Sequence, residues 1–294
     1  MRSATDGSVL VVYHGPAGTP TRRPSRRKAV LNNRCFEYSA TVADRKDFGA
    51  IASPVASTVE TSVHLAHAAG CVVGGDWCET YRVSDRTLAI TIGDVCGHGA
   101  SAYQHMVPIR STLVAAMRAG DRDIAAVLAS ANARLCSEDP GCFVTAIFGY
   151  IDLVERTLRF ASAGHPPPLL AGAMTSHFVR YEHADGPLGL DRTFEPNVSV
   201  FAIPNDAMLV LYTDGVTEHD RDAGQGEMQL ASAAIAAVAD RDASGAAGIA
   251  HRMGLTGRER DDAAIATVWI PCSAAASAMQ SSRPRSVRSR ALKR

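Results

Sequence analysis

Residues 92–101, IGDVCGHGAS, are the stretch from which the fold of this chain is best predicted. An apolar run ends at Asp94, and two glycines, Gly97 and Gly99, follow within five residues. Glycine lets the backbone bend without Cβ clashes, so the chain is free to fold closely around a ligand here. The stretch therefore predicts a buried strand that holds one carboxylate at its end, followed by a helix that begins near residue 100.

The pattern on either side predicts sheets covered by helices. In most expected strands, apolar side chains occupy both the odd and the even positions, which is typical of strands buried on both faces. The exception is 62–68, where apolar and polar residues alternate as in a half-exposed strand. Residues 154–157 (VERT) predict a hairpin turn, and Pro108 predicts a kink or a break near residue 107 of its helix. The expected strands are 62–68, 87–94, 143–153, 157–163, 207–214 and 263–270, and the expected helices are 100–119, 123–136, 227–239 and 243–254.

Composition sets the broad class of the chain. With 46% hydrophobic and 20% charged residues and a net charge of zero, it has no general attraction to nucleic acid or to anionic membranes. No apolar run of about 18 residues is present, so no membrane span is expected. Seven cysteines without a CxxC pair, and no signal-like N-terminus, favour the cytoplasm. We expect one domain over residues 35–271, between a disordered segment at 1–34 and a basic disordered tail at 272–294.

Carboxylates stand at the margins of four expected strands. A single Asp in such a place is commonly a turn residue. Four such segments with few basic neighbours instead indicate a site for divalent cations, and oxygen donors of this kind suit Mg²⁺ or Mn²⁺. Two such ions bind a phosphoryl group and acidify a bridging water, which then attacks phosphorus directly. The carboxylates are Asp76, Asp94, Asp214 and the adjacent pair Asp261 and Asp262, and the main-chain carbonyl of Val95 is a further candidate ligand.

Seven sequence blocks, in order along the chain, resemble one known family. They are GGDW, GDVCGHG, FVTAIFGYID, LRFASAGHPPPLL, GPLGL, LVLYTDGVTE and RDDAAIATVWI. The series is similar to the metal-dependent PPM (type 2C-like) protein serine/threonine phosphatases. It is closest to the bacterial branch of stage II sporulation protein E and the partner-switching stress phosphatases. The resemblance implies an α+β fold, an α-β-β-α sandwich of two mainly antiparallel sheets flanked by helices.

The resemblance also implies roles for individual residues. Asp94 corresponds to the ligand that bridges two Mn²⁺ or Mg²⁺ ions, and Asp94 and Asp76 act in catalysis through the metal-bound water. The remaining implied metal ligands are the Val95 carbonyl, Asp214 and Asp261. Residues that would lie around these ligands without binding the metals themselves are Gly75, Gly93, His98 and Asp262. His165 is expected to belong to a rigid turn with Gly164 at an unusual φ, although a place near the substrate is the alternative.

Family members of this branch act on phosphoserine or phosphothreonine of anti-sigma-factor antagonists, so a phosphorylated protein of that kind is the implied substrate. A regulatory protein is a further implied partner. Two other functions are weighed. A catalytically silent module of the same fold is disfavoured because Asp76, Asp94, Asp214 and Asp261 are all present. An anti-sigma-type ATP-binding kinase is disfavoured because DVCGHG is one residue too long for the Asp-x-Gly-x-Gly loop.

Overall fold

The computed structural model describes residues 36–41, 59–180, 185–218, 222–255 and 261–271. All of them belong to the unit that runs from Asn33 onward. The expected tails at 1–34 and 272–294 lie outside the described residues, so the domain boundaries stay a prediction. No helix among the described residues is long and apolar enough to cross a membrane.

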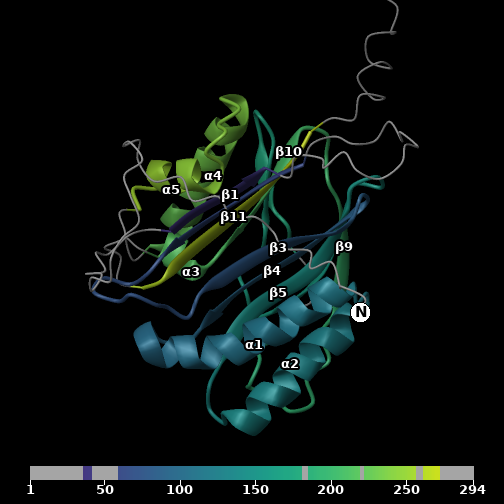
Figure 1. Cartoon of the computed structure of the whole chain (residues 1–294). Helices are drawn as coiled ribbons and strands as arrows, with labels where there is room; N and C mark the ends of the chain where they lie inside the picture. Colours follow the sequence, from purple (N-terminus) through teal and green to yellow (C-terminus); the bar gives the residue numbers. More distant parts are fainter. Residues whose placement is uncertain (1–35, 42–58, 181–184, 219–221, 256–260, 272–294) are drawn as a thin grey trace, which may run out of the picture. The chain divides into compact units, whose positions relative to one another are not determined.

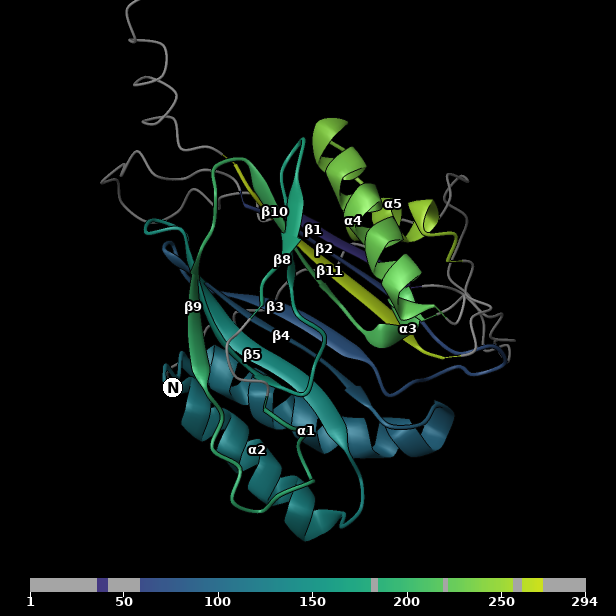
Figure 2. The same cartoon turned by 180° about the vertical axis from the view of Figure 1, so that it is seen from behind.

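Two antiparallel sheets form the centre of the fold (Figures 1 and 2). Sheet A has the strand order β1-β2-β11-β10-β7-β8, and sheet B has the order β3-β4-β5-β6-β9. The strands of sheet A are β1 Phe36–Thr41, β2 Glu60–Ala66, β7 Leu169–Ala171, β8 Ser176–Phe178, β10 Ala207–Tyr212 and β11 Ala263–Ile270. Those of sheet B are β3 Trp77–Ser84, β4 Thr87–Val95, β5 Val144–Asp152, β6 Thr157–Ala163 and β9 Val198–Ala202.

Helices cover the outer face of each sheet. Helices α1 (Gly99–Ala119) and α2 (Ile124–Glu138) lie over sheet B, whereas α4 (Ala223–Ala239) and α5 (Ala246–Arg252) lie over sheet A (Figure 1). One apolar core fills the space between the sheets, and a further core lies beneath each helix pair. These layers confirm the predicted α-β-β-α sandwich.

Local sequence signals explain where several helices begin and end. The Asp123 carboxylate accepts a hydrogen bond from the Ala126 N–H (3.0 Å) and caps α2. Asp222 caps α4 in the same way through the Gln225 N–H (3.0 Å). Helix α1 ends at Ala119 and is followed by Gly120, which has the left-handed φ of +68° common after helix C-termini.

Two local predictions were wrong. Strand β2 is buried on both faces rather than half-exposed, because the turn before α5 covers its outer side; the Ala246 N–H donates to the buried Ser62 Oγ (3.1 Å). Helix α1 is also continuous through Pro108, so the predicted break at residue 107 is absent, while the alternative of a kink stays a prediction. The hairpin between β5 and β6 and the start of α1 at Gly99 agree with the sequence-based expectations.

Candidate metal centre

Asp76 and Asp94 lie side by side at one end of sheet B. Asp94 is the penultimate residue of β4, and Asp76 immediately precedes β3. Strands β3 and β4 are antiparallel, and Trp77 pairs with Gly93 in their register. The end of one strand therefore meets the beginning of the other, which brings the two carboxyl groups into direct contact.

Sheet A presents its carboxylates in the same manner. Asp214 begins the short helix α3 (Asp214–Thr217), two residues after β10, while Asp261 and Asp262 immediately precede β11. Strands β10 and β11 are antiparallel neighbours. The carboxylates that follow one strand and precede the other thus gather at one end of this sheet.

Two hydrogen bonds join these ends across the two sheets. The hydroxyl of Thr213 donates to Asp76 Oδ2 (2.7 Å) and also accepts the Ala264 N–H (2.8 Å). The Gly75 N–H donates to Asp262 Oδ2 (2.8 Å). Thr213 was not among the site residues expected from the sequence, although a hydroxyl within the apolar run LVLYT is a recognisable sign of a buried polar role.

Burial and mutual repulsion favour protonation of Asp76 and Asp94. The pKa of Asp76 is raised well above its ordinary value, first by burial and then by Asp94, against the opposing hydrogen bond from Thr213. Burial, and after it the nearby carboxylates of sheet A, raise the pKa of Asp94 to about 7, although the hydrogen bond with Asp76 opposes this. The two carboxyl groups share a site in which both charges are unfavourable without a cation.

The donor set fits divalent cations. Asp214 is half-buried and Asp261 exposed, and both act on Asp94 through their charges. Burial, Glu218 and Asp261 raise the pKa of Asp214. Within the described residues, no Arg or Lys forms an ion pair with any of these carboxylates. We call Asp76, Asp94, Asp214 and Asp261 the carboxylate centre; its oxygens are the donors that Mg²⁺ and Mn²⁺ prefer.

Asp262 has a different environment from its neighbour Asp261. Its side chain is almost fully buried (2% exposed), and its two oxygens accept the N–H groups of Ala68 and Gly75 at 2.8 Å each. Burial alone raises the pKa of Asp262, but hydrogen bonds from His67 and from these two amides outweigh burial and hold the pKa below its ordinary value. Asp262 therefore fixes the loop that leads to Asp76.

Glycine is required where this loop passes β4. A Cβ atom on Gly75 would lie 2.8 Å from the Val95 carbonyl oxygen, and one on Gly93 would lie 2.1 Å from the Trp77 ring. Gly75 thus allows the Val95 carbonyl to lie against the residue that precedes Asp76. Gly93 instead makes room for a buried tryptophan, which packs in the core beneath α1.

The two histidines considered in the sequence lie in different surroundings. His98 is exposed, and its Nδ1 lies 3.8 Å from the Cys71 Sγ. His165 is buried, and burial lowers its pKa to about 3. Its Nδ1 lies 2.8 Å from the Thr145 Oγ1, and Gly164 before it has the expected positive φ of +67°. His165 is therefore a neutral residue of a buried turn.

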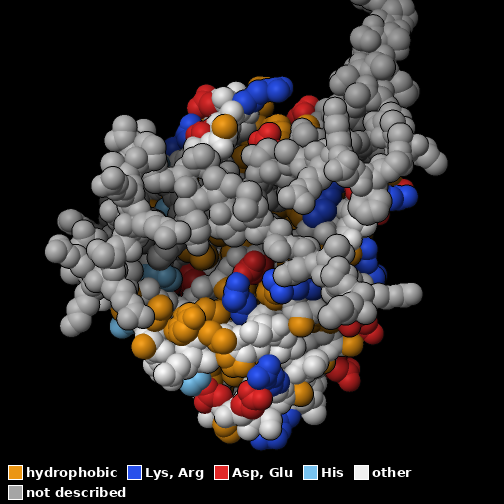
Figure 3. All heavy atoms as spheres, viewed as in Figure 1, with side chains coloured by type: hydrophobic (Ala, Val, Ile, Leu, Met, Phe, Trp, Pro, Cys, Tyr) orange, Lys and Arg blue, Asp and Glu red, His pale blue; other side chains and the backbone are white. Residues whose placement is uncertain are grey.

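Exposed apolar side chains occur on chain segments that adjoin the ligand-bearing strands β3 and β4 in sequence or in the sheet. Figure 3 shows hydrophobic side chains gathered over α1. Tyr103 and Val107 are exposed on this helix, Val72 belongs to the loop before Asp76, and Phe143 precedes β5. We call these four residues the apolar rim.

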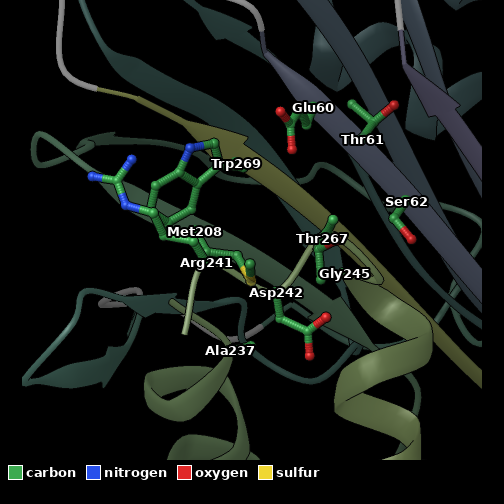
Figure 4. A pocket seen from close by; sticks show the side chains of 11 residues that line it. Glu60, Thr61, Ser62, Met208, Ala237, Arg241, Asp242, Gly245, Thr267 and Trp269 are labelled. Atoms are coloured by element: carbon green, nitrogen blue, oxygen red, sulfur yellow. The ribbon is translucent and has the colours of Figure 1, made fainter. Parts of the chain in front are cut away.

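A separate cavity of about 310 Å³ lies on sheet A beside the connection between α4 and α5 (Figure 4). Met208 of β10 and Trp269 of β11 line it, together with Arg241 and Asp242 of the connection. Met208 and Trp269 are paired at the ends of their strands opposite to the ends that carry Asp214 and Asp262. The cavity is therefore not part of the carboxylate centre.

Comparisons with known proteins agree with this architecture. Residues 84–270 match the family model described as Stage II sporulation protein E (SpoIIE). Phosphoserine phosphatase RsbP of Bacillus subtilis is 28% identical over 158 residues, which cover 50% of this chain and 37% of RsbP. Protein IcfG of Synechocystis is 30% identical over 175 residues, which cover 50% of this chain and 27% of IcfG. The chain thus spans less than half the length of these relatives.

Solved structures show the same fold. The RsbU and RsbW domains of a Mycobacterium tuberculosis protein align with a TM-score of 0.62 at 24% identity, over 72% of this chain and 60% of that one. The PP2C phosphatase domain of SpoIIE from Bacillus subtilis, solved with a fragment of its regulatory domain, aligns with a TM-score of 0.59 at 20% identity, over 73% of this chain and 64% of that one. The family model covers well over half of the sequence, from the last residue of β3 to the end of β11. The chain belongs to the Stage II sporulation protein E (SpoIIE) family.

Proposed function

We propose that this chain is a metal-dependent protein serine/threonine phosphatase that hydrolyses phosphoserine or phosphothreonine on a protein substrate. The observation that carries the proposal is the contact between the Asp76 and Asp94 carboxyl groups at the point where both sheets end, with Asp214 and Asp261 beside them. Such a concentration of acidic oxygens with no paired Arg or Lys among the described residues is costly unless cations neutralise it.

The proposed ligands of two divalent cations, Mn²⁺ or Mg²⁺, are the carboxylate centre and the Val95 carbonyl. Such ions bind phosphoryl oxygens and lower the pKa of water towards neutrality. The residues of the chain keep the ligands in place: Thr213 orients Asp76, and Asp262 fixes the loop at Gly75. His165 is given no proton-transfer role in this proposal, because burial lowers its pKa to about 3 and makes it a weak base.

A protein substrate is supported by the apolar rim. Large apolar side chains exposed next to a site of chemistry are typical of surfaces that bind another protein. The similarity to a phosphoserine phosphatase, RsbP, supports a phosphoserine substrate. From the resemblance to the partner-switching phosphatases, we propose that this substrate is a phosphorylated anti-sigma-factor antagonist. A cytoplasmic location is part of this proposal, since all five cysteines among the described residues are free thiols.

Hydrolysis of a small aryl phosphate and of a phosphorylated antagonist protein, with Mn²⁺, Mg²⁺ or chelator, tests the proposal. Asp94→Asn is expected to abolish the metal-dependent rate on both substrates. Asp85→Asn, a change in the exposed turn between β3 and β4, is the matched control and is expected to keep it. Equal rates in wild type and Asp94→Asn, or no hydrolysis in either, contradict the proposal; the second result favours a silent module.

A further inference from the structure

We propose that His105, Asp139 and Cys142 form a second cation site, for Zn²⁺ or a similar divalent transition-metal ion, apart from the carboxylate centre. One ligand atom from each of the three side chains lies within 4.8 Å of the other two. The proposal does not depend on phosphatase activity, and no residue of the carboxylate centre belongs to this site.

A tight turn brings Asp139 and Cys142 together. Helix α2 ends at Glu138, and the Cys142 N–H donates to the Asp139 carbonyl oxygen (3.2 Å), which closes a four-residue turn. Pro140 and Gly141 occupy its middle, and Gly141 has a φ of +99°. Proline followed by glycine at positive φ is the pattern of a type II turn. The turn therefore presents a carboxylate and a thiol three residues apart from one short, well-defined segment.

His105 reaches this turn from the neighbouring helix α1. Its Nδ1 contacts the Asp139 carboxylate, and the side chains of both residues are 33% exposed. Cys142 is half-buried. All three donors are thus held by defined elements and remain open to an ion from solvent. An ion bound here would tie α1, which follows the Asp94 loop, to the segment that leads into β5.

The chemistry of the donors selects the ion. Imidazole nitrogen, carboxylate oxygen and thiolate sulfur together are ligands of Zn²⁺ and related ions, whereas Mg²⁺ and Ca²⁺ take oxygen donors. With metal–ligand bonds of about 2.0–2.3 Å, tetrahedral ligands lie about 3.3–3.8 Å apart. The three ligand atoms lie within 4.8 Å of one another, so this spacing falls inside the range that the side chains already span. Three protein ligands leave the fourth position for solvent.

Titration with Co²⁺, a spectroscopic substitute for Zn²⁺, tests this site in the full chain carrying Asp94→Asn, which weakens binding at the carboxylate centre. We expect about one equivalent of Co²⁺ to produce a thiolate-to-cobalt charge-transfer band, and Zn²⁺ to remove it by competition. In this background, Cys142→Ser is expected to abolish the band. His105→Ala is expected to weaken Co²⁺ binding by about tenfold or more. Circular dichroism checks that each variant is folded.

Cys136→Ser is the matched control. Cys136 is a buried thiol of α2 whose Sγ donates to Asn132 Oδ1 (3.8 Å), and its replacement is expected to leave the band unchanged. Absence of the band, or an equal band in Cys142→Ser, overturns the proposal and leaves His105 and Asp139 as a plain ion pair between two helices. Because the readout is optical and Asp94 is already replaced, failure of the phosphatase proposal does not affect the outcome.

Discussion

The Thr213 hydroxyl donates a 2.7 Å hydrogen bond to Asp76 Oδ2 and thereby joins the end of β10 in sheet A to the beginning of β3 in sheet B. Thr213 is fully buried and also accepts the Ala264 N–H. One side chain therefore both orients a proposed metal ligand and completes the hydrogen bonding of the neighbouring strand.

Thr213→Val keeps the shape of this side chain and removes both hydrogen bonds. Because a buried carboxyl and a buried N–H lose their partner, we expect the free energy of unfolding to fall by about 1–3 kcal/mol. We also expect weaker Mn²⁺ binding, since Asp76 is no longer oriented. Urea unfolding and calorimetric titration measure the two effects. Thr213→Ser restores the hydroxyl; equal behaviour of the serine and valine variants contradicts the assigned role.

The adjacent residues Asp261 and Asp262 are expected to respond in opposite ways to replacement by Asn. Asp262→Asn disturbs two buried backbone hydrogen bonds, so the metal-free chain should lose about 1–3 kcal/mol of stability. Asp261→Asn relieves repulsion at an exposed site, so stability should stay within about 0.5 kcal/mol or rise, while Mn²⁺ affinity falls. Unfolding in chelator and metal titration of both variants check this, and the reverse pattern refutes the division of roles.

The fold and the members of the carboxylate centre follow from the sequence where the information is local. Apolar runs mark β4, β10 and β11 because strands buried on both faces need apolar side chains at odd and even positions alike. Asp94, Asp214 and Asp261 lie beside the ends of these runs, whereas Asp76 precedes β3. The polar strand β3, WCETYRVS, carries no such pattern, because most of its residues are half-buried or exposed, and it was not predicted.

The supporting contacts depend on tertiary structure. Thr213 and Asp76 are 137 residues apart, and Asp262 is 187 residues from Gly75 and 194 from Ala68. No periodicity within a segment encodes such a partner. The burial of β2 was missed for the same reason. The Ala246 N–H, which donates a hydrogen bond to the Ser62 hydroxyl of this strand, lies 184 residues further along the chain.

The metal-free chain is expected to lose stability as the pH rises from about 4 to 7. The pKa of Asp94 is about 7 in the folded chain, chiefly because of burial, against about 3.9 when unfolded. Between these values the folded state binds more protons than the unfolded state, so rising pH favours unfolding, by at most about 1.4 kcal/mol per pH unit for one proton. Urea unfolding in chelator measures this slope.

Asp94→Asn removes one of the two carboxyl groups whose pKa is raised and should make that slope shallower, whereas the exposed Asp85→Asn should not. Saturating Mn²⁺ at pH 7 is expected to restore the stability of wild type and not that of Asp94→Asn, because a ligand stabilises the folded state that binds it. An identical slope in wild type and Asp94→Asn shows that Asp94 does not titrate as described.

Gly75→Ala is expected to damage the carboxylate centre without touching a carboxylate. The added methyl group meets the Val95 carbonyl oxygen at 2.8 Å, so either this carbonyl or the loop before Asp76 must move. We expect Mn²⁺ affinity to fall and stability to drop by about 1–3 kcal/mol. Gly172→Ala is the matched control, since its nearest neighbour lies 3.8 Å away. If both variants bind Mn²⁺ as wild type does, the close approach has no functional role.

The apolar rim is expected to distinguish a protein substrate from a small one. Tyr103→Ser removes an exposed aromatic ring from α1 without changing any proposed metal ligand. If the rim binds the phosphoprotein, kcat/KM for that substrate should fall about tenfold, the cost of about 1.4 kcal/mol in transition-state binding, mainly through KM. Hydrolysis of an aryl phosphate should be unchanged. Val200→Ser is the matched control, because Val200 is also a large apolar residue that is exposed, but it lies on the edge strand β9. An equal loss on both substrates, or an equal loss in both variants, means that Tyr103 does not bind the protein substrate.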